Sequence, residues 1–139
     1  MILLLSLGCI NDEIFFQRVD IAGRLLSNTP EEPVYVSAHH AWFGQGDLRI
    51  PAKQFDSQRM ESADDFTWIL DVPVREDAEG LVLYAWQDLD GDGDFCGLSG
   101  TEEFSGLYVV DYPTFSASVE ISIQNPCAAS ESLWEEIAE

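Results

Sequence analysis

Acidic residues alternate with other residues in one short segment, Asp88-Leu-Asp-Gly-Asp-Gly-Asp94. Carboxylates at its first, third and fifth positions converge on one point when the chain coils, and the glycine at the sixth position permits the sharp turn. Hard oxygen ligands of this kind suit Ca²⁺, whereas Mg²⁺ demands octahedral geometry and keeps its waters. Without a cation the four negative charges repel one another. The segment therefore predicts a calcium site, and the alternative is an acidic surface turn that binds nothing tightly.

The residues around this segment decide which kind of calcium loop it is. An EF-hand carries a bidentate glutamate at its twelfth position, and that position is Ser99 here. No helical pattern flanks the loop either. We therefore reject an EF-hand.

A closer match is a calcium loop of extracellular β-sandwich domains. The segment from Trp86 to Asp94, followed by Glu103-Phe-Ser-Gly106, resembles the loop of the carboxypeptidase-regulatory-like, or prealbumin-like, class. The resemblance extends in strand order over residues 18–124, with an insertion at 96–101 and Phe104 where that class has proline. It implies five ligands: Asp88, Asp90 and Asp92 through their side chains, Asp94 through its carbonyl or side chain, and Glu103 as the closing carboxylate. Glu102 is the alternative closing ligand.

The three cysteines are Cys9, Cys96 and Cys127. If Cys9 carries lipid, the other two form an even pair, which favours a disulfide in an oxidising compartment. Such a bond would close about 31 residues and contribute roughly 3.5–4 kcal/mol on chain-entropy grounds. Two unrelated thiols are the alternative, and no spacing here resembles a zinc site.

The chain opens with an apolar run, Met1-Ile-Leu-Leu-Leu-Ser-Leu-Gly-Cys9. The run is too short to cross a bilayer, which takes roughly 20 apolar residues. It resembles the end of a bacterial lipoprotein signal, in which small residues precede a cysteine that is acylated. It lacks the basic residues of such a signal, and Ser6-Leu7 reverses the usual order. The resemblance implies lipidation of Cys9 and a location at the outer membrane or cell surface. The alternatives are a buried first strand or simply an ordered apolar terminus.

Other constellations of polar and aromatic residues carry less chemistry. His39 and His40 are neighbours on a predicted strand, so we expect them on opposite faces, one packed and one exposed, and not as joint metal ligands. Adjacent Glu102 and Glu103 do not flank a glycosidic bond from both sides. The sequence has no nucleophile elbow, glycine-rich phosphate loop or Cys–His pair, so we expect no enzyme. Four aromatic residues on strands could stack on sugars, although core packing is the favoured interpretation for them: Trp42, Phe43, Trp68 and Trp86.

Turn residues separate short strand patterns along the chain. A continuous apolar run at 81–86 predicts a central strand that is covered on both faces. The other expected strands are 18–24, 33–42, a short one at 47–50, 66–72, 106–111 and 116–124. Together they predict an all-β fold, a single antiparallel β-sandwich of about seven strands. Ser132 and Glu135 form a capping box that favours a short C-terminal helix.

The length of 139 residues suits one domain. We expect a lipoprotein-signal-like segment at 1–9, a tether at 10–17, the β-sandwich at 18–127 and an acidic tail or short helix at 128–139. Six Lys and Arg against 26 Asp and Glu give a formal charge of −20, which argues against nucleic acid and anionic membrane surfaces as partners.

The sequence as a whole predicts an extracytoplasmic calcium-binding protein with a binding, adhesion or assembly role at the cell surface. Its Ca²⁺ would be structural, and its partner a protein or a glycan. A carbohydrate-binding module and a structural subunit of a surface assembly are the alternatives.

Overall fold

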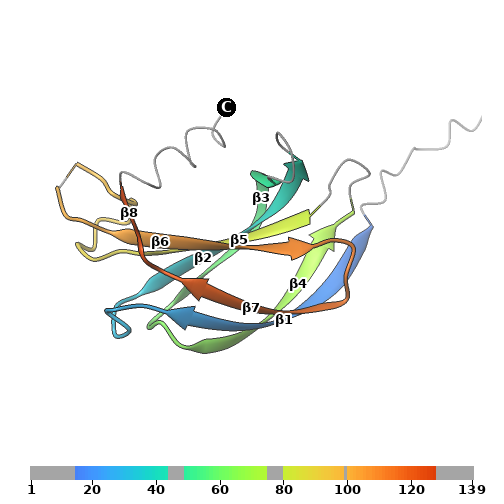
Figure 1. Cartoon of the computed structure of the whole chain (residues 1–139), viewed down its shortest axis with the longest axis horizontal. Coiled ribbons are helices and arrows are strands. Elements are labelled where there is room, and N and C mark those ends of the chain that lie inside the picture. Colours follow the sequence, from blue (N-terminus) through green and yellow to red (C-terminus); the bar gives the residue numbers. More distant parts are fainter. Residues whose placement is uncertain (1–14, 44–48, 75–79, 99, 128–139) are drawn as a thin grey trace, which may run out of the picture.

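A computed structural model of the chain contains two β-sheets that pack face to face (Figure 1). It describes residues 15–43, 49–74, 80–98 and 100–127, without the side chains of residues 42, 43 and 49–53. The smaller sheet has the strand order β4-β1-β7 and the larger sheet the order β3-β2-β5-β6-β8. The strands are β1 (Phe16–Leu26), β2 (Val34–Phe43), β3 (Arg49–Met60), β4 (Asp65–Pro73), β5 (Gly80–Gln87), β6 (Phe104–Asp111), β7 (Ser116–Ser122) and β8 (Asn125–Pro126).

Alternation of apolar and polar residues builds the smaller sheet. In β1 every second residue from Val19 to Leu25 is buried and its neighbours are exposed, and β4 and β7 repeat this pattern. Successive side chains of a strand point to opposite faces, so the buried rows face the larger sheet and share one core with it. The predicted all-β sandwich is confirmed.

One pair of neighbouring strands departs from the predicted antiparallel arrangement. β1 runs antiparallel to β4 but parallel to β7, with partners from Asp20 and Ser116 to Leu26 and Ser122. The chain leaves the larger sheet after β6 and enters the smaller one at β7. The direction of β7 relative to β1 follows from this crossing between the sheets. Periodicity along each strand carries no information about it.

Strand β5 lies in the middle of the larger sheet, between β2 and β6. Leu81, Leu83 and Ala85 belong to the core between the sheets, while Val82 and Tyr84 are buried on the opposite face. This confirms the prediction of a central strand that is covered on both faces.

Strand β3 is the main difference from the sequence-based assignment, which placed only a short strand at 47–50. It runs from Arg49 to Met60 and pairs with β2 alone. An edge strand needs no regular apolar pattern, and Pro51 and Lys53 are residue types that edge strands accept. The polar segment 53–59 therefore gave no strand signal.

The boundaries of the domain differ slightly from the prediction. β1 begins at Phe16, within the expected tether at 10–17. The predictions for residues 1–9, including Cys9, and for the tail at 128–139 lie outside the described residues. Among the described residues, no helix is long and apolar enough to cross a bilayer.

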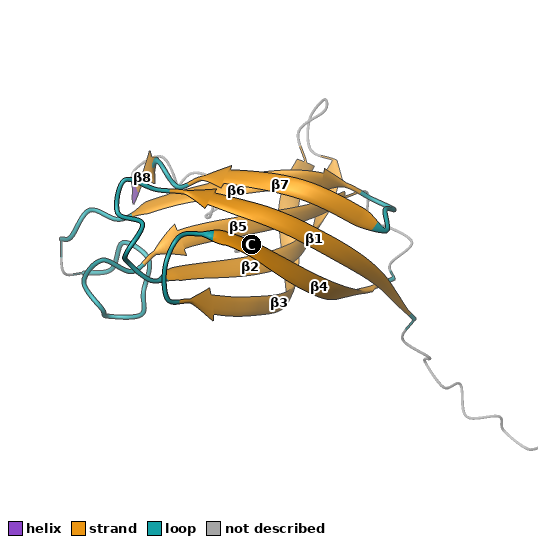
Figure 2. Cartoon of the chain, turned by 90° about the horizontal axis from the view of Figure 1, so that it is seen from below, coloured by secondary structure: helices purple, strands orange, loops and turns teal. Residues whose placement is uncertain are grey.

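The sandwich has two ends, which we name by their contents (Figures 1 and 2). The disulfide end consists of the turns at 27–33 and 61–64, the 88–103 connection and β8. The β1-start end consists of residues 15–18, Pro73, Val74 and the 112–115 connection. The 88–103 connection and the start of β1 lie at opposite ends of the long axis.

Candidate metal site

The acidic segment begins where β5 ends, so a central strand fixes its first carboxylate. Asp88 follows the last residue of β5 directly and is only 7% exposed. Its Oδ1 accepts a hydrogen bond from the N–H of Gly91 at 2.8 Å, and its Oδ2 one from the N–H of Gly93 at 2.9 Å. Asp88 thus coils the chain around its own side chain.

Two glycines make this coil possible. Gly91 and Gly93 have φ of 76° and 79°, in the left-handed region that other residues adopt at a cost. The carboxylates on either side follow the same turn, because Asp90 Oδ1 accepts from the N–H of Asp92 at 3.1 Å and Asp92 Oδ1 from the N–H of Asp94 at 2.8 Å. The alternation of Asp and Gly seen in the sequence therefore produces a tight acidic loop.

Glu103 reaches this loop from the other end of the 88–103 connection. Its side chain is fully buried, one residue before β6. Oε1 accepts from the N–H of Leu89 at 3.0 Å, and Oε2 from the N–H of Cys96 at 2.6 Å. Each carboxylate oxygen has a second lone pair, so these bonds leave acceptor capacity for a cation.

Four carboxylates converge in this way: Asp88, Asp90, Asp92 and Glu103. One oxygen from each lies within 4.8 Å of the others. Two oxygens bound to one Ca²⁺ at about 2.3–2.6 Å can be at most roughly 4.6–5.2 Å apart, so the spacing suits a shared ion of this size. The donor set is made only of hard oxygen atoms, as Ca²⁺ prefers.

The side chains of the two remaining predicted ligands take other positions, and the prediction of the Asp94 carbonyl as a ligand stays a prediction. Asp94 is exposed, its carboxylate is not part of the converging group, and its N–H holds Asp92. Glu102 points elsewhere, because its Oε1 accepts from the N–H of Cys127 at 3.3 Å. Of the two candidates for the closing carboxylate, the structure brings Glu103 to the group.

The disulfide predicted between Cys96 and Cys127 is present, with the two Cα atoms 5.6 Å apart. It joins the acidic connection to the segment just after β8. Cys96 also holds Glu103 through its backbone, so the covalent link and the buried carboxylate meet at one residue.

Burial raises the pKa of Glu103 above the usual value of a glutamate. Hydrogen bonds from the N–H groups of Cys96 and Leu89 act in the opposite direction, and the charges of Asp90 and Asp88 raise the pKa again. A group of carboxylates without a counter-charge therefore disfavours its own full ionisation.

The pKa of Asp92 is also raised above the usual value of an aspartate. The N–H of Asp94 lowers its pKa, but desolvation, a side-chain hydrogen bond with Asp90 and the charges of Asp90 and Asp88 outweigh this, and the net direction is upward.

A buried glutamine beside the site gave no sequence signal. Gln87, the last residue of β5, is 1% exposed. Its side-chain oxygen accepts from the hydroxyls of Ser27 and Thr29, and its NH₂ group donates to the carbonyls of Thr29 at 2.9 Å and Glu32 at 3.2 Å. Gln87 thereby fastens the 27–33 turn next to the acidic connection.

No protein-family model, curated protein or solved structure matches the chain. The resemblance to the carboxypeptidase-regulatory-like class therefore stays a prediction, and the geometry has to carry the functional argument.

The histidine pair differs from its prediction. His39 and His40 are 2% and 1% exposed, so both are buried where one exposed side chain was expected. They pair with consecutive residues of β5 and so face opposite sides of the sheet, as predicted. His40 packs against Phe55 on the core side, with ring centroids 4.9 Å apart. The outer face of the larger sheet is covered at His39. Alternation therefore predicted correctly that His39 faces away from the core, but not that it is buried there.

His39 makes one contact that sequence reasoning missed. Ser37 Oγ lies 2.8 Å from His39 Nε2, because residues two apart on a strand share a face. Such a pair could act as nucleophile and base. The pair lies where β2 is continuous with β5 but shifts register against β3, between Ala38 and Ala41.

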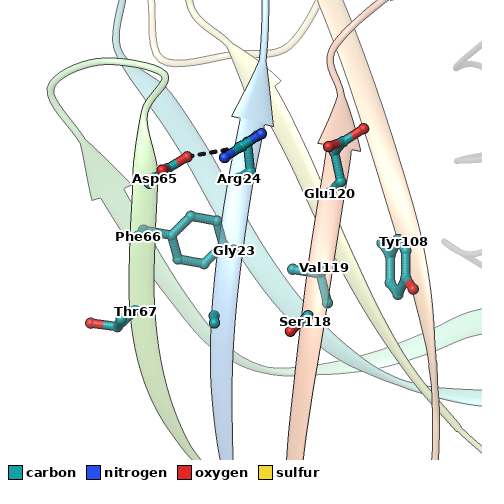
Figure 3. Close-up of a pocket in the computed structure, with 10 residues that line it drawn as sticks. Gly23, Arg24, Asp65, Phe66, Thr67, Tyr108, Ser118, Val119 and Glu120 are labelled. Carbon is teal, nitrogen blue, oxygen red and sulfur yellow. Dashed lines mark hydrogen bonds and ion pairs between the residues drawn. The ribbon is translucent and has the colours of Figure 1, made fainter.

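A shallow hollow of about 660 Å³ lies along β4, β1 and β7 (Figure 3). The ring of Phe66 lies over Gly23, where a Cβ atom would come within 2.1 Å of that ring. Arg24 and Asp65 form an ion pair at 3.1 Å on its rim, and both are exposed. An exposed pair of this kind contributes little energy, and the hollow resembles a groove over a glycine more than a built binding site.

Proposed function

We propose that the chain is an extracytoplasmic calcium-binding β-sandwich protein with a binding, adhesion or assembly role at the cell surface. The observation that carries the proposal is the convergence of four carboxylates, one of them the fully buried Glu103, within 4.8 Å. Glu103 is far from the Asp loop in sequence, so a simple acidic turn would not bring it there.

Electrostatics give the cation a structural task in this proposal. The chain already has a formal charge of −20, and the cluster adds repulsion at one point. Burial, and to a smaller degree the charges of Asp90 and Asp88, raises the pKa of Glu103. A divalent ion would neutralise part of this charge and hold the two ends of the 88–103 connection together, which would turn that connection into a defined surface.

Calorimetric titration of the chelator-treated full chain with Ca²⁺ tests the site. We expect one binding event and a higher melting temperature; at a free concentration of 100 times Kd the added stability is about 2.7 kcal/mol. Mg²⁺ should bind more weakly because it loses its waters reluctantly. Absence of both heat and thermal shift would refute the proposal, and equal affinity for Mg²⁺ would refute the calcium preference.

Two ligand variants and a matched control locate the event. Asp92→Asn, on the exposed side, and Glu103→Gln, on the buried side, should each weaken Ca²⁺ binding by about tenfold or more. Glu102→Gln removes the same charge from the neighbouring residue, whose carboxylate faces Cys127, and should change affinity little. A loss as large in Glu102→Gln would mean that general charge, not this cluster, attracts the ion.

The disulfide supports the proposed compartment, because such bonds form and persist mainly outside the reducing cytosol. Lipidation of Cys9 belongs to the same proposal and rests on the sequence resemblance alone. Mass spectrometry of the chain isolated from membranes of a producing cell tests it: an unmodified Cys9 would remove the anchor but not the metal site.

The carbohydrate-binding alternative gains little from the described aromatic residues. Trp68 is in the core, and Trp86 stacks on Tyr35 with ring centroids 4.6 Å apart and also contacts Phe95. The structural-subunit alternative would use a sheet edge, such as β3, for pairing between copies. Concentration-dependent sedimentation distinguishes it from a monomer.

A further inference from the structure

Large apolar side chains are exposed together at the β1-start end of the sandwich. Phe15, Phe16, Val74 and Phe115 are 68%, 58%, 50% and 80% exposed. Single exposed apolar residues are common on soluble proteins, but a group of three phenylalanines and a valine at one end marks an interaction site.

Backbone and side-chain contacts bring the segments that carry these residues together at this end, where the consecutive residues Phe15 and Phe16 point to opposite sides of the sheet. The N–H of Val74 donates to the carbonyl of Phe15 at 2.8 Å, and Phe16 pairs with Pro73. The 112–115 connection joins them through β1, in two hydrogen bonds of 2.8 and 3.0 Å: Gln17 Nε2 to Thr114 O, and Asp20 N to Phe115 O. Three separate segments of the chain thus build the surface on the sheet framework.

The sequence limits how far this surface can be from the predicted anchor. Five residues lie between Cys9 and Phe15, and the six Cα-to-Cα steps from one to the other span at most about 20 Å when fully extended. A lipid on Cys9 would therefore keep the β1-start end within about 20 Å of the bilayer. This step rests on the lipid anchor of the proposed function.

The charges restrict the kind of lipid that this end could contact. The 88–103 connection, which carries the converging carboxylates, lies at the opposite end of the long axis (Figure 1). The β1-start end is acidic too: Arg18 pairs with Asp71 at 3.6 Å, but the sequence carries Asp12 and Glu13 just before Phe15 and Glu76 and Asp77 just after Val74. A chain of −20 is repelled by anionic lipid, so the surface that fits is a bilayer of zwitterionic headgroups.

We propose that Phe15, Phe16 and Phe115, with Val74 beside them, insert into the interfacial region of a zwitterionic lipid bilayer. Aromatic and aliphatic side chains of peripheral proteins bind in this region through the burial of apolar area. The anchored sandwich then stands with its β1-start end on the membrane and its acidic 88–103 connection directed away from it. A single acyl chain gives only marginal membrane binding, and this surface would supply the second contact.

Flotation with phosphatidylcholine vesicles tests the surface without the lipid. The full chain carrying Cys9→Ser is compared with the same chain carrying Phe15→Ser, Phe16→Ser and Phe115→Ser. The vesicle partition coefficient should fall by roughly tenfold or more in the triple variant, since each lost phenylalanine removes buried apolar area. Leu98→Ser is the matched control: Leu98 is fully exposed at the disulfide end, and partition should not change.

Several results would overturn the proposal. Equal flotation of the triple variant would assign vesicle binding to the apolar run at residues 1–7. An equal loss in Leu98→Ser would mean that any exposed apolar residue suffices. Unchanged flotation together with a loss of self-association in sedimentation would assign the surface to contact with a second copy.

A second measurement reports orientation and separates the surface from the anchor. Tryptophan introduced as Phe16→Trp should be quenched by brominated acyl chains beyond the parent chain, whereas Leu98→Trp should not. Equal quenching at the two positions would contradict the orientation. The mass of Cys9 is measured independently, so an unmodified cysteine with phenylalanine-dependent flotation removes the anchor and keeps the surface. An acylated cysteine without that dependence removes the surface and keeps the anchor.

Discussion

The two ends of the sandwich are stabilised by different means. At the disulfide end, buried polar groups and a covalent bond fix the connections: Glu103 holds Leu89 and Cys96, Gln87 holds the 27–33 turn, and Cys96 is bonded to Cys127. At the β1-start end, three phenylalanines and a valine are exposed, and Gln17 donates one side-chain hydrogen bond to the 112–115 connection. Under our two proposals, the disulfide end holds an ion and the β1-start end contacts a membrane.

The largest expected effect concerns the disulfide end. Replacing both Cys96 and Cys127 by serine should lower the free energy of unfolding by about 3–4 kcal/mol, because the bond closes a chain segment with a sequence separation of 31. Denaturant unfolding of the wild-type and variant chains measures the difference. Calcium affinity should fall as well, since Cys96 positions Glu103.

Cys9→Ser is the control for thiol loss and should leave unfolding unchanged. A destabilisation of less than about 1 kcal/mol in the double variant would mean that the 88–103 connection is already fixed by its hydrogen bonds. The claim that the disulfide helps to fix the connections at the disulfide end would then be contradicted.

A pair of glutamine variants compares the two ends directly. Gln87→Ala removes hydrogen bonds to Ser27, Thr29 and Glu32 from a buried position, and we expect a loss of about 2–3 kcal/mol. Gln17→Ala removes one bond to Thr114, and we expect about 1 kcal/mol or less. Thermal unfolding of both variants gives the order, and equal losses would contradict the proposed asymmetry.

The sequence predicted the metal-loop part of the disulfide end because its information is local. Asp88, Asp90 and Asp92 alternate within one turn, and glycine permits the coil, so spacing alone indicates convergence. The choice between Glu102 and Glu103 depended on the strand that follows them. Side chains of adjacent residues diverge, and only the start of β6 determines which one turns inward.

Features that depend on packing between distant segments were beyond the sequence pattern. Gln87 is buried because the 27–33 turn supplies its partners, and nothing near it in sequence indicates this. β3 is a strand because β2 offers an edge, and the burial of both His39 and His40 requires a covered outer face. Alternation predicts which residues share a face, but not whether that face meets solvent.

The smallest expected effect is a pH dependence that separates the metal-free site from the occupied one. The pKa of Glu103 is raised in the folded chain, mainly by burial. A raised pKa means that this group's contribution to stability is fully present below its unfolded-state pKa and is lost as pH rises through its folded-state pKa. In chelator, the wild-type chain should therefore lose a small part of its stability as pH rises through this range, relative to Glu103→Gln, which lacks the titrating group.

Saturating Ca²⁺ should reverse the sign of this pH dependence, because the ion competes with the proton for the carboxylate and binds more tightly as pH rises. Melting temperatures of both chains between about pH 4 and pH 7, with and without Ca²⁺, measure the effect, and Glu102→Gln should follow the wild type. The same slope in chelator for wild type and Glu103→Gln would show that Glu103 does not report on the charge crowding at the disulfide end.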